Sequence, residues 1–334
     1  MHIFITGVAG FLGSNLANHF IQKGQRVSGN DNLVGGDLEN VNPKVKFYKK
    51  DCEDFEFNKS VFKNVDVVIH AAAYAHEGLS NFAPYLITRN IFSGSVSVFS
   101  AAVENGVKRV VFMSSMARYG KNSGKIFREK DEPIPVDPYG IAKLAAENVL
   151  KNLSELHGIE YNIAVPHNII GPNQRYIDPF RNVAAIMINL MLQKRRPIIY
   201  GDGNQKRCFS DIRDCIFCID KLAFNKKIKS QLINIGPDEH YISVNELYDI
   251  ISNLLQFNQQ PIFFPDRPNE VKYANCSADK SRKILNYKTR HNIEETLIEM
   301  IKDIKKKGPK KFLYNYNIEI NSKILPKTWK NKIF

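Results

Sequence analysis

Three glycines near the start of the chain restrict how its first residues can fold. A short apolar run, residues 3–5, is followed by Gly7, Gly10 and Gly13, after which apolar residues recur at the spacing of a helix. Gly7 permits a tight turn, Gly10 lets the backbone come close to a ligand, and Gly13 lets the helix pack on the strand. A glycine triplet alone also suits a flexible loop, but strand, turn and helix in this order predict a site for the diphosphate of a dinucleotide.

An acidic residue follows where such a site requires one. A second apolar segment ends at Asp31, about twenty residues after the glycines. Its carboxylate can accept hydrogen bonds from both ribose hydroxyls of an adenosine, whereas a 2′-phosphate would meet a like charge. The sequence therefore predicts NAD rather than NADP as the cofactor.

Residues after three later segments extend the predicted cofactor site. Asp51 follows a strand expected at 45–48, and it can either meet the adenine amino group or cap the next helix. The small residues 71–73 allow a flat ligand to come close, and a long helix expected at 84–106 carries Asn90 inward.

Strands and helices alternate along the chain. Strands are expected at 3–5, 45–48, within 65–73, and at 109–115, 161–166, 196–200 and 232–236, and helices after Gly10, at 84–106, from Pro138, and at 179–193 and 244–255. This alternation predicts an α/β fold with a doubly wound parallel sheet of the Rossmann type.

The pattern loosens in the second half of the chain, which indicates a smaller α/β domain interleaved with the first. We expect residues 1–168 to bind NAD, with a returning segment around 208–236. Residues 169–207 and 237–305 would form the substrate domain, and 306–334 a basic tail.

The net charge of +13 raises the question of a nucleic-acid partner. From residue 302 to the end, ten lysines face two acidic residues, so this tail holds +8 of the charge and a nucleic-acid partner is not expected. No run of eighteen apolar residues and no signal sequence is found, so we expect a cytoplasmic protein without a membrane span. Cys215 and Cys218 lack a second pair or suitably spaced histidines, which predicts buried thiols and no metal site.

Tyr139 and Lys143 are four residues apart on an expected helix and share one of its faces. A nearby ammonium favours a phenolate, so we expect Lys143 to lower the pKa of Tyr139 from about 10. A phenolate can take the proton of a sugar hydroxyl while hydride leaves the same carbon for a nicotinamide, and Ser115 can bridge the two oxygens. The spacing alone also fits a surface helix, but after the glycine motif it predicts a catalytic set.

Together these motifs resemble those of the extended short-chain dehydrogenases/reductases, and most of all the NAD-dependent nucleotide-sugar epimerases of the UDP-glucose 4-epimerase kind. The resemblance covers roughly residues 1–305. The matching segments are Gly7-x-x-Gly10-x-x-Gly13, Asp31-Asn-Leu, Asp51, His70-Ala-Ala-Ala, Ser114-Ser115-Met-Ala-Arg-Tyr119-Gly, Tyr139-x-x-x-Lys143, His167-Asn168-Ile-Ile-Gly-Pro172, Tyr200-Gly-Asp-Gly-Asn-Gln-Lys-Arg207 and Arg267-Pro-Asn-Glu270.

The resemblance implies a role for each matching residue. Tyr139 would be the base, Lys143 its electrostatic partner and a ribose ligand, and Ser115 a proton relay. The cofactor site would comprise Gly7, Gly10, Phe11, Leu12, Gly13, Asp31, Asn32, Asp51, Cys52, Ala71, Ala72, Ala73, Asn90, Tyr139 and Lys143.

A nucleotide-diphosphate sugar is the substrate that the resemblance implies. Ser115 would also contact it, and Asn168 would lie by its diphosphate. Arg207 and Arg267 would clamp phosphates with their planar guanidinium groups, and Glu270 would hold the nucleotide ribose.

The reaction type depends on the residues after Ser115. Related 4,6-dehydratases carry Asp-Glu there, whereas Met116 and Ala117 cannot transfer protons. The resemblance therefore implies oxidation at C4, rotation of a 4-keto sugar and hydride return to its other face. A nucleotide-sugar dehydrogenase or reductase that releases the keto-sugar is the alternative, and a non-catalytic NAD-sensing regulator is a third interpretation.

Several features lie outside the common pattern. Tyr74 and Arg118 are larger than usual and are expected to reshape the sugar pocket, and Ala274 is expected to leave room for an N-acetyl or other bulky sugar. The aromatic-rich tail from 308 is expected to pack on its own domain or on a partner subunit. The family also suggests a homodimer through helices near 84–106 and 139–153, and a place in polysaccharide biosynthesis.

Overall fold

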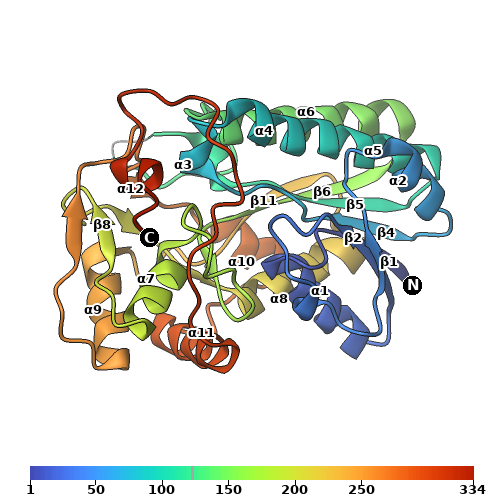
Figure 1. Cartoon of the computed structure of the whole chain (residues 1–334). Coiled ribbons are helices and arrows are strands. Elements are labelled where there is room, and N and C mark those ends of the chain that lie inside the picture. Colours follow the sequence, from blue (N-terminus) through green and yellow to red (C-terminus); the bar gives the residue numbers. More distant parts are fainter. Residues whose placement is uncertain (122–123) are drawn as a thin grey trace.

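The computed structural model describes residues 1–121 and 124–334. A parallel sheet of seven strands runs through its centre in the order β3-β2-β1-β4-β5-β6-β11 (Figure 1). The strands are β1 (His2–Thr6), β2 (Arg26–Asp31), β3 (Lys46–Lys49), β4 (Val67–His70), β5 (Arg109–Met113), β6 (Glu160–Pro166) and β11 (Gln231–Ile235). The order reverses between β1 and β4, so a crevice forms beyond the carboxyl ends of these strands. The predicted Rossmann-type sheet is confirmed.

Helices cover both faces of this sheet (Figure 1). One face carries α1 (Phe11–Gln22), α8 (Ile212–Phe224) and α10 (Asp279–Leu285), and the other carries α2 (Phe55–Val61), α5 (Gly94–Glu104) and α6 (Pro138–His157). Side chains alternate along β1, so Ile3 and Ile5 enter the first core and Phe4 enters the second. Burial on both sides explains why β1, β4 and β5 consist largely of apolar residues.

A smaller group of strands and helices follows β6. β7 (Ile169–Ile170) pairs with β10 (Ser210–Asp211), β8 (Ile198–Tyr200) with β13 (Ile262–Phe264), and β9 (Lys206–Arg207) with both β12 (Ile242–Ser243) and β14 (Tyr273–Ala274). The helices α7 (Val183–Leu192), α9 (Val244–Leu255) and α11 (Ile293–Lys307) share a core of their own. Cys215 and Cys218 are buried thiols in α8, as predicted.

The helix predicted at 84–106 is interrupted. α4 (Pro84–Thr88) passes into a π-helical turn, η2 (Arg89–Ser93), before α5 begins. π-Helical turns are rare and are frequent at functional sites. This one carries Asn90, whose side-chain oxygen accepts a hydrogen bond from the Tyr74 backbone N–H at 2.9 Å.

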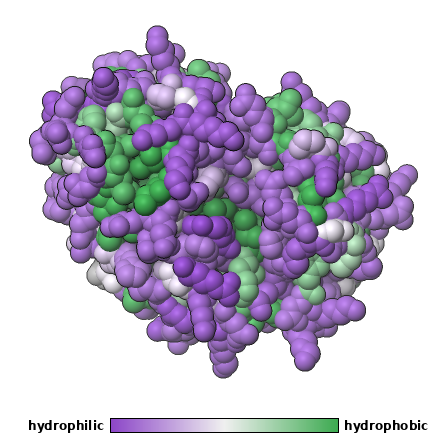
Figure 2. All heavy atoms as spheres, turned by 90° about the horizontal axis from the view of Figure 1, so that it is seen from below, coloured by the Kyte–Doolittle hydropathy of each residue, from purple (hydrophilic) through white to green (hydrophobic). Residues whose placement is uncertain are grey.

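The stretch Pro84–Glu104 has the length and composition of a membrane span, and it is the one such helix among the described residues. Core helices share these properties, and its Ile87, Ile91 and Val98 side chains are fully buried in the core. The stretch is therefore weak evidence for a membrane. Figure 2 shows one face of the molecule as mainly hydrophilic, with hydrophobic atoms in separate patches.

Four short elements were not predicted, because each spans only three or four residues and so shows no clear periodicity. They are α3 (Glu77–Ser80), the 3₁₀ turns η1 (Leu38–Asn40) and η3 (Met116–Tyr119), and α12 (Lys327–Lys330). The turn predicted at 168–171 instead contains β7, which pairs with β10 about forty residues later. Such long-range pairing leaves no local signal in the sequence.

Residues 309–334, called the C-terminal arm below, pack on their own chain. In Figure 1 the arm rises from the end of α11 and turns back to α12. The backbone N–H groups of Glu319 and Ile320 donate to the Phe82 carbonyl at 2.8 and 2.9 Å. The arm shares a core with α3, α4, α6 and α7 through Phe312, Tyr316, Leu325, Trp329 and Phe334. The prediction of an arm packed on its own domain is confirmed.

Replacing Trp329 with alanine should lower the free energy of unfolding by about 3–5 kcal/mol, because the buried ring packs on Phe82 and Phe180. Chemical denaturation followed by circular dichroism measures this loss. Leu156→Ala, at the exposed end of α6, is the control and should change the value by less than about 0.5 kcal/mol. Identical unfolding curves for wild type and Trp329→Ala would contradict the packing of the arm.

Candidate active site

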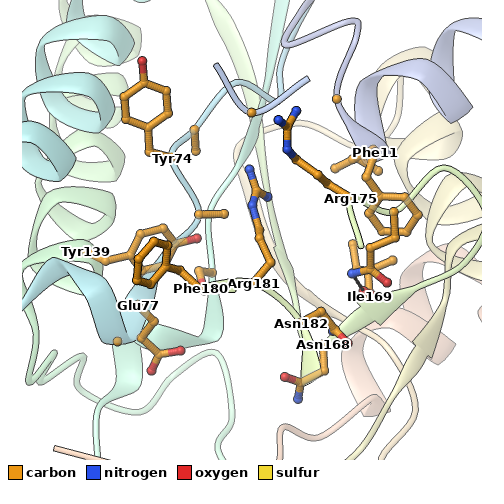
Figure 3. Close-up of a pocket in the computed structure, with 18 of the residues that line it drawn as sticks. Phe11, Tyr74, Glu77, Tyr139, Asn168, Ile169, Arg175, Phe180, Arg181 and Asn182 are labelled. Carbon is orange, nitrogen blue, oxygen red and sulfur yellow. Dashed lines mark hydrogen bonds between the residues drawn. The ribbon is translucent and has the colours of Figure 1, made fainter. Parts of the chain in front are cut away.

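One cavity of about 460 Å³ brings the predicted site residues together (Figure 3). It lies at the carboxyl edge of the central sheet, where the strand order reverses, and the smaller group of elements forms its other wall. The predicted residues that line it are Gly7, Gly10, Phe11, Leu12, Gly13, Asp31, Asn32, Asp51, Cys52, Ala71, Ala72, Ala73, Asn90, Ser115, Tyr139, Lys143, Asn168, Arg207, Arg267 and Glu270. Their individual roles stay predictions.

The glycine turn is closed by backbone contacts. A Cβ atom on Gly7, whose φ is +70°, would lie 2.8 Å from the Ala72 Cα, and one on Gly13 would lie 2.1 Å from the Gly7 carbonyl oxygen. Gly10 precedes α1, and no side chain caps the first N–H groups of that helix. These groups stay available to a diphosphate, so the turn fits the cofactor that the motif predicts.

Asp31, at the end of β2, is held by the loop that follows the strand and by the glycine turn. Its two carboxylate oxygens accept hydrogen bonds from the backbone N–H groups of Leu33 at 2.8 Å and Ala9 at 3.1 Å. Burial is the largest influence on its pKa and raises it. The carboxylate is therefore fixed in position beside the turn, as a ribose ligand must be.

Asp51 and Asn32 form the next part of the wall. The Asn32 side-chain amide donates to the Asp51 carboxylate at 2.7 Å and to the Tyr74 hydroxyl at 2.9 Å. The alternative that Asp51 caps the next helix is wrong, because Asp54 is the N-cap of α2 and accepts from the Phe57 N–H at 3.0 Å.

The predicted catalytic residues meet between β5 and α6. Lys143 donates from Nζ to the Met113 carbonyl at 2.8 Å and lies 6.0 Å from the centre of the Tyr139 ring. Ser115 is the N-cap of η3, and its Oγ accepts from the Ala117 N–H at 3.2 Å. Helix α6 places Tyr139 and Lys143 on one face, and both side chains are buried.

The protein alone does not lower the pKa of Tyr139. Burial raises it to about 12 and outweighs the hydrogen bond from Ser115, which lowers it. Burial also lowers the pKa of Lys143 to about 7. The expectation that Lys143 brings the Tyr139 pKa toward neutrality is therefore wrong for the protein alone, because desolvation disfavours both charged forms.

The predicted phosphate-binding residues form one charged network. Glu270 pairs with Arg267 at 2.6 Å through one carboxylate oxygen and with Arg207 at 3.2 Å through the other. The Arg267 guanidinium also lies 5.0 Å from the centre of the Tyr200 ring. Asn168 adopts a left-handed φ of 41°, and its side chain donates to the Cys208 carbonyl at 3.1 Å. The arginines are therefore held in fixed positions at one end of the cavity.

Two of the three expectations about pocket shape are wrong. Arg118 does not line the cavity, because it pairs at 3.0 Å with the buried carboxylate of Glu147. Tyr74 does line the cavity, and its hydroxyl accepts a hydrogen bond from the Asn32 side chain, so its effect on the sugar pocket stays a prediction. Ala274 is buried in β14 and is not among the lining residues.

Many of the lining residues were not predicted, and five of these bear on the charge and shape of the site. Figure 3 shows Arg181 and Arg175 extending into the cavity, with Tyr139 and Glu77 on the opposite wall from Arg175. The five are Glu77, Asp137, Arg175, Arg181 and Phe334. Asp137 alone had a local signal, since an acidic residue before Pro138 is typical of a helix N-cap, and it accepts from the Gly140 N–H at 2.8 Å.

The fold and the site define an NAD-binding enzyme of the extended short-chain dehydrogenase/reductase type. Residues 3–236 match the model of the NAD dependent epimerase/dehydratase family, and the chain belongs to that family. The predicted family and cofactor are thus confirmed.

Relatives match the chain over most of its length. It is 32% identical over 304 residues to the putative UDP-glucose 4-epimerase of Methanocaldococcus jannaschii, covering 90% of this chain and 97% of that one. It is 26% identical over 329 residues to the UDP-glucuronate 4-epimerase of Thermodesulfobacterium geofontis, covering 91% and 99%. The UDP-glucose 4-epimerase of Thermotoga maritima, solved with UDP-glucose, superimposes with a TM-score of 0.87 at 28% identity and covers 92% and 99%.

Replacing Asp31 with asparagine should weaken NAD binding by about 10- to 100-fold, because a charged acceptor for ribose hydroxyls becomes neutral. Cofactor released by heat from gel-filtered protein, assayed enzymatically, measures the amount retained. Asp249→Asn, on the exposed side of α9, is the matched control and should retain NAD as the wild type does. If both variants retain the same amount of NAD, the assignment of Asp31 to the cofactor site is wrong.

Proposed function

We propose that the protein is an NAD-dependent UDP-sugar 4-epimerase. The observation that carries the proposal is that Ser115, Tyr139 and Lys143 line the same cavity as the glycine turn and the Arg207–Arg267 pair. The glycine turn would bind the diphosphate of the cofactor, and the two arginines would bind the diphosphate of the substrate. Tyr139, the proposed proton-transfer group, lies between these two binding sites. The relatives named above support UDP as the nucleotide.

In the proposed reaction, the glycine turn and Asp31 would hold NAD, which would supply the hydride acceptor for C4 of the sugar. Tyr139 takes the proton of the C4 hydroxyl as the carbonyl forms, and it gives the proton back when the alcohol is restored. Ser115 relays this proton through its hydroxyl. Lys143, whose Nζ donates to the Met113 carbonyl at 2.8 Å beside Tyr139, would serve as a ligand of the NAD ribose.

The residues after Ser115 favour return of the hydride over loss of water. Met116 and Ala117 begin η3 and offer no group that exchanges protons. The 4-keto sugar would therefore rotate and be reduced on its other face. The arginine network would hold the nucleotide diphosphate during this rotation.

We also propose that the two domains expected from the sequence bind different ligands. Residues 1–168 with 208–236 would hold NAD, and residues 169–207 with 237–305 would hold the nucleotide sugar. The glycine turn and Asp31 come from the first set, and both phosphate-binding arginines come from the second, which supports this division.

A homodimer through the outer face of α4 and α6 is a further part of the proposal. Large apolar side chains are exposed on this layer, which supports an interface there. They include Tyr85, Phe92 and Ile141.

A proton NMR time course of the purified protein with UDP-sugars and no added NAD tests the proposal. A new anomeric signal that approaches a fixed ratio would support a self-contained epimerase. A keto-sugar that forms only with stoichiometric NAD would instead establish a dehydrogenase. No change in any sugar would contradict the proposal.

Tyr139→Phe should lower kcat by about 10²- to 10⁴-fold, because the ring remains and the proton-transfer group is lost. Initial rates from the NMR assay measure this effect, and the bound NAD should be unchanged. Tyr161→Phe, on β6 and away from the cavity, is the control and should keep wild-type rates. A rate for Tyr139→Phe within a factor of two or so of that control would exclude Tyr139 as the base.

A further inference from the structure

Glu77 places a carboxylate without a partner in the cavity. It is the first residue of α3, and its side chain is exposed toward the cavity (Figure 3). Its carboxylate forms no hydrogen bond and no ion pair with any other residue that the structure describes. A carboxylate that faces the cavity without a protein partner is available to a ligand.

The position of Glu77 identifies the part of a ligand that it would face. The charges that act on it are those of Asp137, Arg207, Arg267 and Glu270, and Glu77 in turn acts on Tyr139. The neighbouring Gly78 lies close enough to the arginine network that a Cβ there would be 3.5 Å from Arg267 Nη1. Glu77 thus lies between the proposed base and the proposed phosphate clamp.

A nucleotide sugar must cross this same interval. Its reacting carbon, C4, has to reach Tyr139, while its anomeric carbon carries the diphosphate that Arg207 and Arg267 would hold. The sugar ring lies between these two points, so its ring substituents would meet Glu77. In Figure 3 the Glu77 side chain extends away from the Arg181 guanidinium, which points toward the other end of the cavity.

The charges around this interval oppose a second carboxylate. Each arginine that lines the described cavity already has an acidic partner: Arg207 and Arg267 share Glu270, Arg175 lies 3.0 Å from Asp37, and Arg181 lies 3.6 Å from Asp178.

Lys143 also lines the cavity, where its Nζ donates to the Met113 carbonyl at 2.8 Å, and two further titratable groups lie near Glu77. Of these, His76 pairs with Asp178 at 2.9 Å, and Asp137 accepts from the Gly140 N–H. Asp137 adds a further acidic group rather than a positive charge.

We propose that Glu77 binds the hydroxyl or amide groups of the sugar and makes the enzyme select neutral hexoses over uronic acids. This inference rests on the proposed function, since it assumes that a nucleotide sugar occupies the cavity. Like charges in a site with little solvent screening discriminate strongly between ligands. The relatives include a putative UDP-glucose 4-epimerase and a UDP-glucuronate 4-epimerase, so a neutral sugar and a uronic acid are the two substrates to compare.

The selection should depend on pH. The walls of the cavity desolvate the Glu77 carboxylate, and this effect, followed by the charge of Asp137, raises the pKa of Glu77 to about 7. Below that pH the group is a neutral donor that tolerates a sugar carboxylate, and above it the group is an anion that repels one. Discrimination against uronic acids should therefore increase as the pH rises from 6 to 8.5.

Measuring kcat/KM of the holoenzyme for UDP-glucose and UDP-glucuronate at pH 6 and pH 8.5 tests the proposal. At pH 8.5 the wild type should prefer UDP-glucose by at least about tenfold, and the preference should fall at pH 6. Glu77→Gln should lower the preference at pH 8.5 by about tenfold and remove its pH dependence. Glu56→Gln, on the exposed side of α2, should behave as the wild type.

A preference for UDP-glucuronate in the wild type, or an unchanged ratio in Glu77→Gln, would overturn the proposal. Calorimetric binding of both sugars to Tyr139→Phe protein, with and without Glu77→Gln, separates this failure from failure of the proposed function. If binding discriminates between the two sugars through Glu77 but the wild type epimerises neither, the proposed selectivity is supported and the proposed epimerase activity is contradicted. No binding of either sugar would remove both.

Discussion

The closeness of two backbone segments at the glycine turn determines the geometry of the rest of the site. A Cβ on Gly13 would lie 2.1 Å from the Gly7 carbonyl oxygen, and one on Gly7 would press on the backbone of Ala72. Helix α1 can therefore begin against β1 only because side chains are absent there. The strand order reverses between β1 and β4, so a crevice lies beyond the carboxyl ends of these strands. The close contact at the glycine turn forms the floor of this crevice.

Charge pairing is the second constraint on the cavity. Burying a charge costs free energy unless it is paired, so the arginines that would bind phosphates need an acid to hold them before any ligand arrives. Glu270 does this for Arg207 and Arg267 together, and it fixes both guanidinium groups in advance. The same logic explains why Arg118 is not in the pocket, because the buried Glu147 requires a cation.

Local spacing was sufficient to predict the central sheet, the glycine turn and the Tyr139–Lys143 pair, because strand ends and helix faces follow from short-range periodicity. The resemblance to the family, rather than spacing, supplied Arg207, Arg267 and Glu270. The failures share a different cause. The sequence does not reveal that Arg118 turns toward Glu147, that a π-helical turn carries Asn90, or that burial dominates the pKa of Tyr139. Each depends on segments that are distant in the chain, and Glu77 likewise becomes visible only when α3 is placed beside the arginine network.

The C-terminal arm shows how far such distant contacts reach. The match to the relative from Methanocaldococcus jannaschii covers 97% of that protein and 90% of this chain, so about a tenth of this chain lies outside the match. The Tyr316 ring packs on Tyr74 and His76 from one wall of the cavity and faces Phe180 from the other. Farther on, the Thr328 hydroxyl is 2.5 Å from that of Tyr200, beside the arginine network. Any movement that parts the two walls must break one set of these contacts, so the arm stabilises the closed arrangement of the cleft in addition to its own fold.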